Sequence, residues 1–252
     1  MSDGDAPVML VTGATGSIGG AVARDALAKG WRVVLHGRDA ARLAALADEI
    51  DPDGNATVRM CIDLSEEDAA TRLVAEAGAM AGRIDAVVDC VSMGAPRTVG
   101  TFDATQPERY TEMLALSLGH VERLAHAALP LLSAKGGTFV ALASDAGRHA
   151  APNQSIIGAA RAGTIGFVRN LAVEVARKGV RVHCICATFV ADSESARRLS
   201  GHARDRLRKA EAKAGLGLPT CRDVSVLALF LCSDEAARMT GQILSVNGGL
   251  NA

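Results

Sequence analysis

The sequence predicts an α/β fold in a single domain over residues 1–252, with a doubly wound parallel sheet and helices on both faces. Apolar strand-like runs alternate with helical patterns along the chain, which is typical of β–α–β units. The strand-like runs are continuously apolar, as expected for strands that are covered on both faces. A glycine-rich segment joins the first strand to the first helix.

The expected elements follow one another in chain order. The strand-like runs are VMLVTGA, WRVVLHG, TVRMCIDL, IDAVVDCVS, GTFVALAS, VRVHCICATF and QILSVNG. Helical patterns follow the first five runs, at about 18–29, 40–50, 66–80, 108–132 and 156–177. A helix after each strand returns the chain to the same edge of the sheet, so that successive strands run parallel.

Composition excludes several classes of protein. The chain has 252 residues and is 49% apolar, which is enough for a full core. Its 27 basic and 28 acidic residues nearly cancel, which argues against a nucleic-acid binder. The first residues do not have the pattern of a signal peptide, and no run approaches the roughly 18 apolar residues of a membrane span. We therefore expect a cytoplasmic protein without membrane contact.

The six cysteines lie scattered, without C-x-x-C pairs or neighbouring ligand clusters. They are expected to be reduced core residues, and no metal site is predicted.

A polar segment at about 190–216 stands out. Within it, residues 193–214 carry seven Lys or Arg against three Asp or Glu, and we expect one or two polar helices inserted after a strand. One interpretation is a solvated helix face. The other is a lid over the substrate site that attracts an anionic ligand such as a phosphate-bearing thioester.

The glycine-rich segment VTGATGSIGG predicts a dinucleotide site. Gly13, Gly16 and Gly19 have T-G-x-x-x-G-x-G spacing and lie between a strand and a helix. Glycines permit a tight turn and allow backbone N–H groups to approach a pyrophosphate, which the start of the helix also attracts. The alternative is a tight turn that no longer binds a dinucleotide.

The end of the second strand, LHGRD, favours NADP(H) over NAD(H). An NAD-selective site places an acidic residue here, whereas this chain has Gly37 followed by Arg38. Arginine suits a 2′-phosphate, although Arg38 is also compatible with a simply exposed strand end. Asp63 is positioned to accept from the adenine amino group, or else to cap the following helix.

These motifs resemble the short-chain dehydrogenase/reductase family over essentially the full chain. The resemblance rests on residues 12–19, CIDLS at 61–65, GTFVALASDAG at 137–147 and CSDEAARMTGQILSVNGG at 232–249, the last being ketoacyl-reductase-like. It implies a Rossmann-type sheet, a nicotinamide cofactor and usually a homotetramer. The cofactor-binding residues that it implies are Thr12, Gly13, Thr15, Ser17, Ile18, Gly19, Arg38, Asp63 and Arg161.

The resemblance also implies a catalytic tetrad of Asn, Ser, Tyr and Lys, of which this chain keeps one member. Ser144 stands at the Ser position, Ile157 at the Tyr position and Arg161 at the Lys position; Leu116 stands within one residue of the Asn position. Isoleucine cannot transfer a proton, and arginine stays protonated. The single tyrosine, Tyr110, lacks the Lys spacing.

Further departures lie around the expected nicotinamide end. The family's N-N-A-G is replaced by residues 89–92, its Pro-Gly by Ala187-Thr188, and a carboxamide-binding Thr by Asp192. Four residues are candidates for a substitute proton donor, although a simply structural or exposed role is also open for each: Asp89, Asp145, His149 and Asp192.

Three functions follow from this pattern. The first is a non-catalytic subunit that pairs with an active related chain in a hetero-oligomeric dehydrogenase of the hydroxyacyl-CoA type, with an acyl-CoA as a further ligand; a homotetramer is the alternative assembly. The second is an atypical NADP(H)-dependent oxidoreductase that uses Ser144 and Arg161. The third is a binding protein that senses a dinucleotide without performing chemistry.

Overall fold

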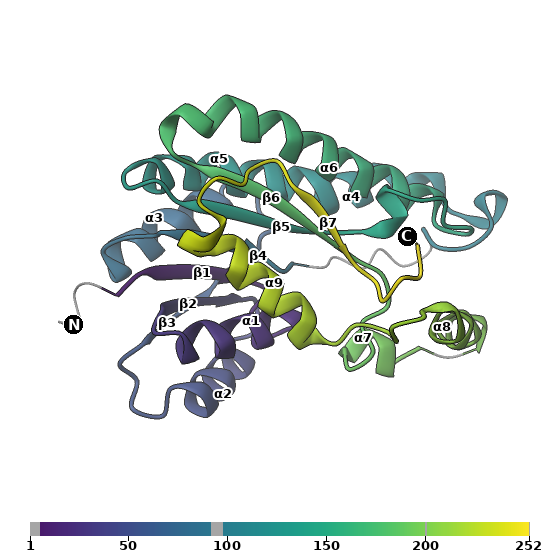
Figure 1. Ribbon diagram of the computed structural model, residues 1–252, viewed down its shortest axis with the longest axis horizontal. Coiled ribbons are helices and arrows are strands. Elements are labelled where there is room, and N and C mark those ends of the chain that lie inside the picture. Colours follow the sequence, from purple (N-terminus) through teal and green to yellow (C-terminus); the bar gives the residue numbers. More distant parts are fainter. Residues whose placement is uncertain (1–5, 92–97, 200, 252) are drawn as a thin grey trace.

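The computed structural model describes residues 6–91, 98–199 and 201–251. Seven parallel strands form one sheet in the order β3-β2-β1-β4-β5-β6-β7 (Figure 1). The strands are β1 (Val8–Thr12), β2 (Arg32–Gly37), β3 (Thr57–Cys61), β4 (Ala86–Asp89), β5 (Thr138–Ser144), β6 (Arg181–Ala187) and β7 (Ile243–Val246). The predicted doubly wound α/β sheet is therefore confirmed.

The strand order reverses beside β1. This strand pairs with β2 on one side and with β4 on the other, and the register places Thr12 opposite Asp89. All five residues of β1 are buried, because helices cover both faces of the sheet. Such a reversal opens a crevice at the carboxyl ends of the strands, where ligands of this fold class bind.

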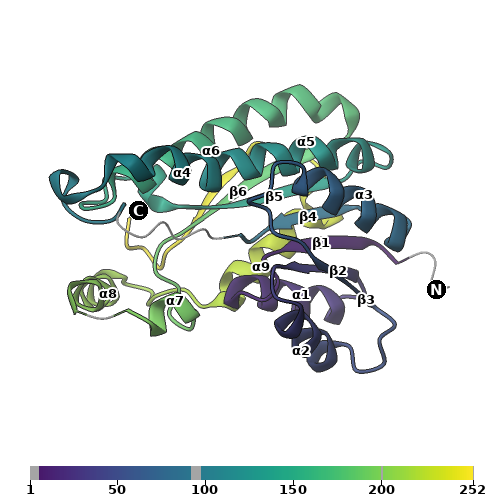
Figure 2. The same cartoon turned by 180° about the vertical axis from the view of Figure 1, so that it is seen from behind.

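Two layers of helices enclose the sheet (Figures 1 and 2). One face packs on α1 (Ser17–Ala28), α2 (Ala40–Ile50) and α9 (Cys221–Cys232). The other face packs on α3 (Ala69–Ala81), α5 (His120–Ser133) and α6 (Ser155–Val175). Each layer buries aliphatic side chains against alternate residues of the same strands, and this burial is the main stabilising contribution.

The pattern at 108–132 is not the single helix that it predicts. A 3-10 turn at Pro107–Arg109 leads into α4 (Tyr110–Leu114), a π-helical segment at Ala115–Gly119 and then α5. A π segment widens the helix locally and shifts the faces that its residues present. Periodicity at 3.6 residues does not reveal such a shift.

Two helices follow β6 within the polar segment. They are α7 (Glu194–Arg197) and α8 (Gly201–Lys213), and both views place them beyond the end of β6, with α8 the farther from the two helix layers (Figures 1 and 2). Sequence patterning did not single out α9, although a capping box of Thr220 and Asp223 marks its start. Along the described residues, no helix is long and apolar enough to cross a membrane.

A buried carboxylate ties the centre of the sheet to α5. Thr12 Oγ1 donates to Asp89 Oδ1 at 2.5 Å, and His120 Nε2 lies 3.0 Å from Asp89 Oδ2. The Val91 amide also donates to Asp89. Burial alone raises the pKa of Asp89, but the attraction of His120 and these hydrogen bonds bring that pKa below its usual value. Asp89 therefore stays ionised and joins β1, β4 and α5.

A buried histidine on β6 predicts a pH-dependent stability. Burial, followed by the positive charge of Arg181, lowers the pKa of His183 from 6.5 to about 4. Between these values the unfolded chain binds a proton that the folded chain refuses, so the free energy of unfolding falls as the pH falls.

We expect wild-type protein to lose up to about 3 kcal/mol relative to the His183→Leu variant between pH 7 and pH 4. Urea unfolding at several pH values in this range measures the difference. His126→Leu is the control, since His126 is exposed on α5 and should leave the pH profile unchanged. Parallel profiles for wild type and His183→Leu would contradict the assignment.

Candidate functional site

The glycine-rich loop joins β1 to α1 and has no room for side chains. Gly13 has a φ of +64°, and a Cβ on it would lie 2.9 Å from the Cys90 carbonyl oxygen. A Cβ on Gly19 would lie 2.3 Å from the Gly13 carbonyl oxygen. Gly16 precedes α1 without a side-chain cap, so the amides at the start of this helix remain available to an anion. These features fit the pyrophosphate of a dinucleotide.

His36 of β2 supports the loop from below. The Gly13 amide approaches His36 Nδ1 at 3.4 Å, and His36 Nε2 lies 2.9 Å from the Ile62 carbonyl. Burial is the main cause that lowers the pKa of His36. A neutral ring suits this arrangement, because one nitrogen then accepts from Gly13 while the other donates to Ile62.

The loop opens onto a cavity of about 540 Å³. The residues that line it come from the glycine loop, the ends of β4, β5 and β6, the helices α4, α6 and α7, and Leu199 beyond α7. Among the predicted site residues, the cavity brings together Ser17, Ile18, Gly19, Ser144, Ile157 and Arg161. A volume of this size is typical of small-molecule sites.

The other predicted residues lie around this cavity rather than along its wall. Thr12 is buried beneath the loop and donates to Asp89. Thr15 lines a neighbouring groove beside α1, which shares Gly16, Ser17 and Glu194 with the cavity. Met113 of α4 lines the cavity one turn from Leu116, which does not. In the π-helical segment, the neighbour Ser117 is buried and donates to the Met113 sulfur.

Arg38 and Asp63 lie near the carboxyl ends of β2 and β3. Arg38 is exposed. Asp63 Oδ1 accepts from the Ser65 amide at 3.0 Å, and hydrogen bonds from Ser65 followed by the charge of Arg38 lower the pKa of Asp63. Asp63 therefore stabilises a local turn. The expectation that it caps the following helix is wrong, because α3 begins later, at Ala69, and its N-cap residue is Asp68.

None of the four candidate proton donors lines the cavity within the described part of the chain. Asp145 is buried and accepts from Ser245 Oγ and from Asn247 Nδ2. Asp192 accepts from the Cys221 amide at 2.7 Å and so secures the start of α9. Asp89 is occupied by its buried contacts. These three carboxylates therefore have the structural role that was the alternative to proton donation.

His149 and the single tyrosine also have positions of their own. The His149 amide donates to the Asp145 carbonyl, and its ring does not line the cavity. Tyr110 Oη lies 2.5 Å from Thr105 Oγ1, and its ring stacks on Phe102 at a centroid distance of 6.3 Å. Ser92, the last residue of the altered N-N-A-G motif, lies outside the described residues.

Ser144 and Arg161 face the cavity from β5 and α6. Ser144 Oγ accepts from the Ala146 amide at 3.3 Å, which leaves its proton free to donate. Arg161 is only 7% exposed, and its Nη1 donates to the Leu142 carbonyl at 3.4 Å. Ile157 presents an aliphatic side chain one turn away on the same helix. This end of the cavity can donate hydrogen bonds to an oxygen atom.

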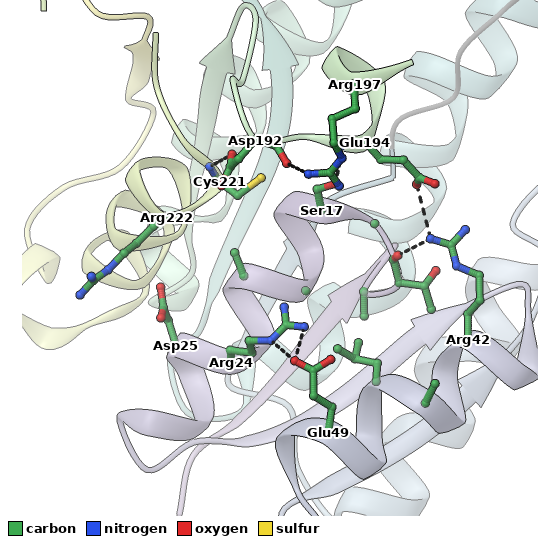
Figure 3. A pocket seen from close by; sticks show the side chains of 17 residues that line it. Ser17, Arg24, Asp25, Arg42, Glu49, Asp192, Glu194, Arg197, Cys221 and Arg222 are labelled. Atoms are coloured by element: carbon green, nitrogen blue, oxygen red, sulfur yellow. Dashed lines mark hydrogen bonds and ion pairs between the residues drawn. The ribbon is translucent and has the colours of Figure 1, made fainter. Parts of the chain in front are cut away.

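Sequence reasoning missed Glu194, which connects α7 to the glycine loop. The Glu194 amide donates to Ser17 Oγ at 2.8 Å. The Glu194 carboxylate accepts from Arg198 at 2.5 Å and approaches Arg42 of α2 at 3.5 Å (Figure 3). Arg42 also donates to the Thr15 carbonyl. The sequence signal for Glu194 was its position in the first turn of a helix, directly after the good N-cap residue Ser193.

Figure 3 shows the groove beside α1, with a volume of about 620 Å³, in which charged groups largely satisfy one another. Arg24 pairs with Glu49 at 2.7 Å, and Arg197 donates to the Asp192 carbonyl at 2.6 Å. Because carboxylates hold Arg24 and Arg42 and a backbone carbonyl holds Arg197, this groove is a weaker candidate for an anion site than the cavity at the glycine loop. Among the described residues, no three His, Cys, Asp or Glu side chains gather as a metal site would require.

His120, the partner of Asp89, was also missed. It lies on the buried stripe of α5 together with Val121, Leu124 and Ala125. A histidine at an apolar position of an amphipathic helix signals a buried polar partner.

Comparisons with known proteins place this chain in one family. Residues 13–251 match the family described as enoyl-(acyl carrier protein) reductase. The chain is 30% identical to the 3-oxoacyl-(acyl-carrier-protein) reductase FabG of Chlamydia muridarum, with 96% of each covered. It is 32% identical to a (5R,7aS)-5-hydroxy-7a-methyl-1-oxo-2,3,5,6,7,7a-hexahydro-1H-indene-carboxyl-CoA reductase of Mycobacterium tuberculosis, with 96% of this chain and 92% of that protein covered.

A solved structure agrees with these relatives. An oxidoreductase of the short-chain dehydrogenase/reductase family from Burkholderia thailandensis superposes with a TM-score of 0.82 at 30% identity. The match covers 98% of this chain and 93% of that one. The protein is therefore a member of the short-chain dehydrogenase/reductase family of NAD(P)-dependent oxidoreductases, and within it resembles the ketoacyl reductases.

Proposed function

We propose that this chain is a dinucleotide-binding subunit that does not itself transfer protons to substrate. In this proposal it pairs with an active related chain in a hetero-oligomeric dehydrogenase of the hydroxyacyl-CoA type. The observation that carries the proposal is the cavity between the glycine loop and α6, where Ile157 and Arg161 stand in place of the expected tyrosine and lysine.

The titratable groups along the described cavity wall support this proposal. They are Cys90, Arg161, Glu194 and Arg198. Burial raises the pKa of the Cys90 thiol well above its usual value, and Glu194 is held by Arg198. A general acid needs a pKa near the working pH and reach to the substrate oxygen. A buried thiol, an ion-paired carboxylate and two guanidinium groups are poor choices for that role.

The rest of the site fits binding. A bound NADP(H) would supply or accept hydride. The glycine loop would hold its pyrophosphate, Arg38 its 2′-phosphate, and Ser144 would donate to a carbonyl oxygen. In this proposal the described cavity wall provides no group that delivers the proton, and an active partner subunit would provide that step at its own site.

The choice of a CoA ester rests on charge and on the relatives. One relative is named as acting on a carboxyl-CoA and another on an acyl-carrier-protein thioester. In this chain, α8 carries Arg204, Arg206, Arg208 and Lys209 beyond the sheet. Such a basic helix would attract the phosphates of a CoA ester.

A second candidate function is an atypical NADP(H)-dependent oxidoreductase. The observation in its favour is the pair of Ser144 and Arg161 on one cavity wall, since two donors can stabilise an oxyanion that forms as a polarised double bond accepts hydride.

The partner proposal is tested by native mass spectrometry of the protein isolated from its own host without overexpression. We expect a complex that contains this chain and a related chain of similar mass. The related chain should carry the Tyr-x-x-x-Lys motif. An assembly of this chain alone would contradict the partner proposal and favour the atypical oxidoreductase.

The cofactor preference predicts an effect of Arg38→Ala. Loss of a charge-assisted contact of about 1.5–3 kcal/mol should weaken NADPH binding by roughly 10- to 100-fold. NADH has no 2′-phosphate, so its affinity serves as the internal control and should stay unchanged. Fluorescence titration measures both constants. Equal losses for the two dinucleotides, or none, would show that Arg38 does not bind the 2′-phosphate.

Restoring the missing groups should create a reductase. We expect the Ile157→Tyr/Arg161→Lys double variant to oxidise NADPH with acetoacetyl-CoA at least about 100-fold faster than wild type, the lower range of general-acid contributions. Ile157→Phe/Arg161→Lys is the matched control, because it adds a ring without a hydroxyl. If wild-type protein is already as fast as the double variant, then its site is not deficient in proton transfer.

A further inference from the structure

The guanidinium of Arg161 is a buried cation with donors to spare. The residue is 7% exposed, and within the described residues its hydrogen bond is the 3.4 Å contact from Nη1 to the Leu142 carbonyl. A guanidinium carries five N–H groups. None of its nitrogens is both fully buried and without a hydrogen-bond partner, and Arg161 lines the cavity. The donors that Leu142 leaves free are therefore reachable from the cavity.

No carboxylate neutralises this charge in the described structure. Asp89 is the acidic group that acts on Arg161 electrostatically, but its oxygens already accept from Thr12, His120 and the Val91 amide. Glu194, on the same cavity wall, is held by Arg198 at 2.5 Å. Buried charges in proteins are normally paired, so Arg161 retains an unused capacity for an anion.

A hydroxyl group lies on the same wall. Ser144 Oγ accepts from the Ala146 amide and keeps its own proton for a further partner. Thr188 also lines the cavity, but its Oγ1 is enclosed by protein atoms and is not offered to a ligand. An oxygen-rich group at this end of the cavity would therefore meet a cation and the Ser144 donor together.

Much of the remaining cavity wall is apolar, although Gln154, Glu194 and Arg198 also line it. The apolar part includes Val91, Met113, Leu142, Ile157, Phe189 and Leu199. A single arginine in such surroundings suits a planar anion with one charge, because the guanidinium fork matches both oxygens of a carboxylate. A phosphate would carry up to two charges into this space, where Arg161 is the cation that no carboxylate holds, because Arg198 is paired with Glu194. The geometry thus selects a ligand with an apolar body and one carboxylate.

We propose that the α6 end of this cavity binds the carboxylate of an apolar organic acid, with Arg161 as its counter-ion and Ser144 as a second donor. This inference rests on the proposed function in treating the cavity as a binding site rather than a site of proton transfer. It requires neither the dinucleotide nor a partner chain, and it adds a carboxylate ligand to the CoA ester of the proposed function.

Isothermal titration calorimetry of the purified chain with octanoate tests the proposal. Octanamide is the matched neutral probe, since it has the same chain length and a similar head. We expect octanoate to bind at least about 10-fold more tightly than octanamide, as a charge-assisted hydrogen bond predicts. Equal affinities for the two probes on wild-type protein would overturn the proposal without recourse to any variant.

Variants assign the binding to Arg161. Arg161→Met should weaken octanoate binding by roughly 10- to 100-fold and leave octanamide binding unchanged. Arg161→Lys keeps a charge but not the fork, so its affinity for octanoate should lie between those of wild type and Arg161→Met. Arg177→Met is the control, because Arg177 is exposed beyond the end of α6. Circular dichroism verifies that each variant is folded.

NADPH titration of the same variants separates the two possible anions at this site. If Arg161→Met weakens NADPH and leaves octanoate unchanged, then Arg161 serves the dinucleotide and the carboxylate proposal is wrong. Selective loss of octanoate binding supports it. The proposed function fails on different evidence, namely on the subunit composition and on the Ile157→Tyr/Arg161→Lys assay.

Discussion

The ionised carboxylate of Asp89 is the contact on which the central part of this structure depends. It lies at the carboxyl end of β4 and accepts from Thr12 of β1 and His120 of α5. Removing one partner of a buried charge costs about 3–5 kcal/mol. The next residue, Cys90, presents the carbonyl against which Gly13 packs. The sheet, one helix layer and the floor of the glycine loop therefore share one anchoring group.

The fold was readable from the sequence because its signals are local. Continuous apolar strands, the helices at 40–50 and 156–177 and the glycine spacing each depend on neighbouring residues. Features set by distant contacts were not readable. The π-helical segment depends on how residues 115–119 pack. Helix α9 was missed although its signal is local, a capping box at Thr220 followed by an apolar run. The partners of Asp145 lie 100 residues away or more.

The candidate site divides in the same way. Gly13 and Gly19 were identified because their lack of a side chain is itself the signal, and the close backbone contacts at both positions give the steric reason. The resemblance to the family groups Ser144, Ile157 and Arg161, and the three residues line one cavity. The sequence pattern does not show whether a polar side chain faces that cavity. Asp145 and Asp192 instead accept hydrogen bonds from Asn247 and from the Cys221 amide. Side-chain direction at a loop depends on tertiary contacts, and one-dimensional spacing does not encode it.

The contact between α7 and Ser17 allows one hydroxyl group to take part in two hydrogen bonds. Its oxygen accepts from the Glu194 amide, which leaves its proton available to an anion at the start of α1. A hydroxyl that accepts one hydrogen bond becomes a stronger donor of another. Any phosphate that takes this proton therefore also tightens the hold on α7. Because such coupling is reciprocal, a docked α7 and an occupied glycine loop favour each other through a single oxygen atom.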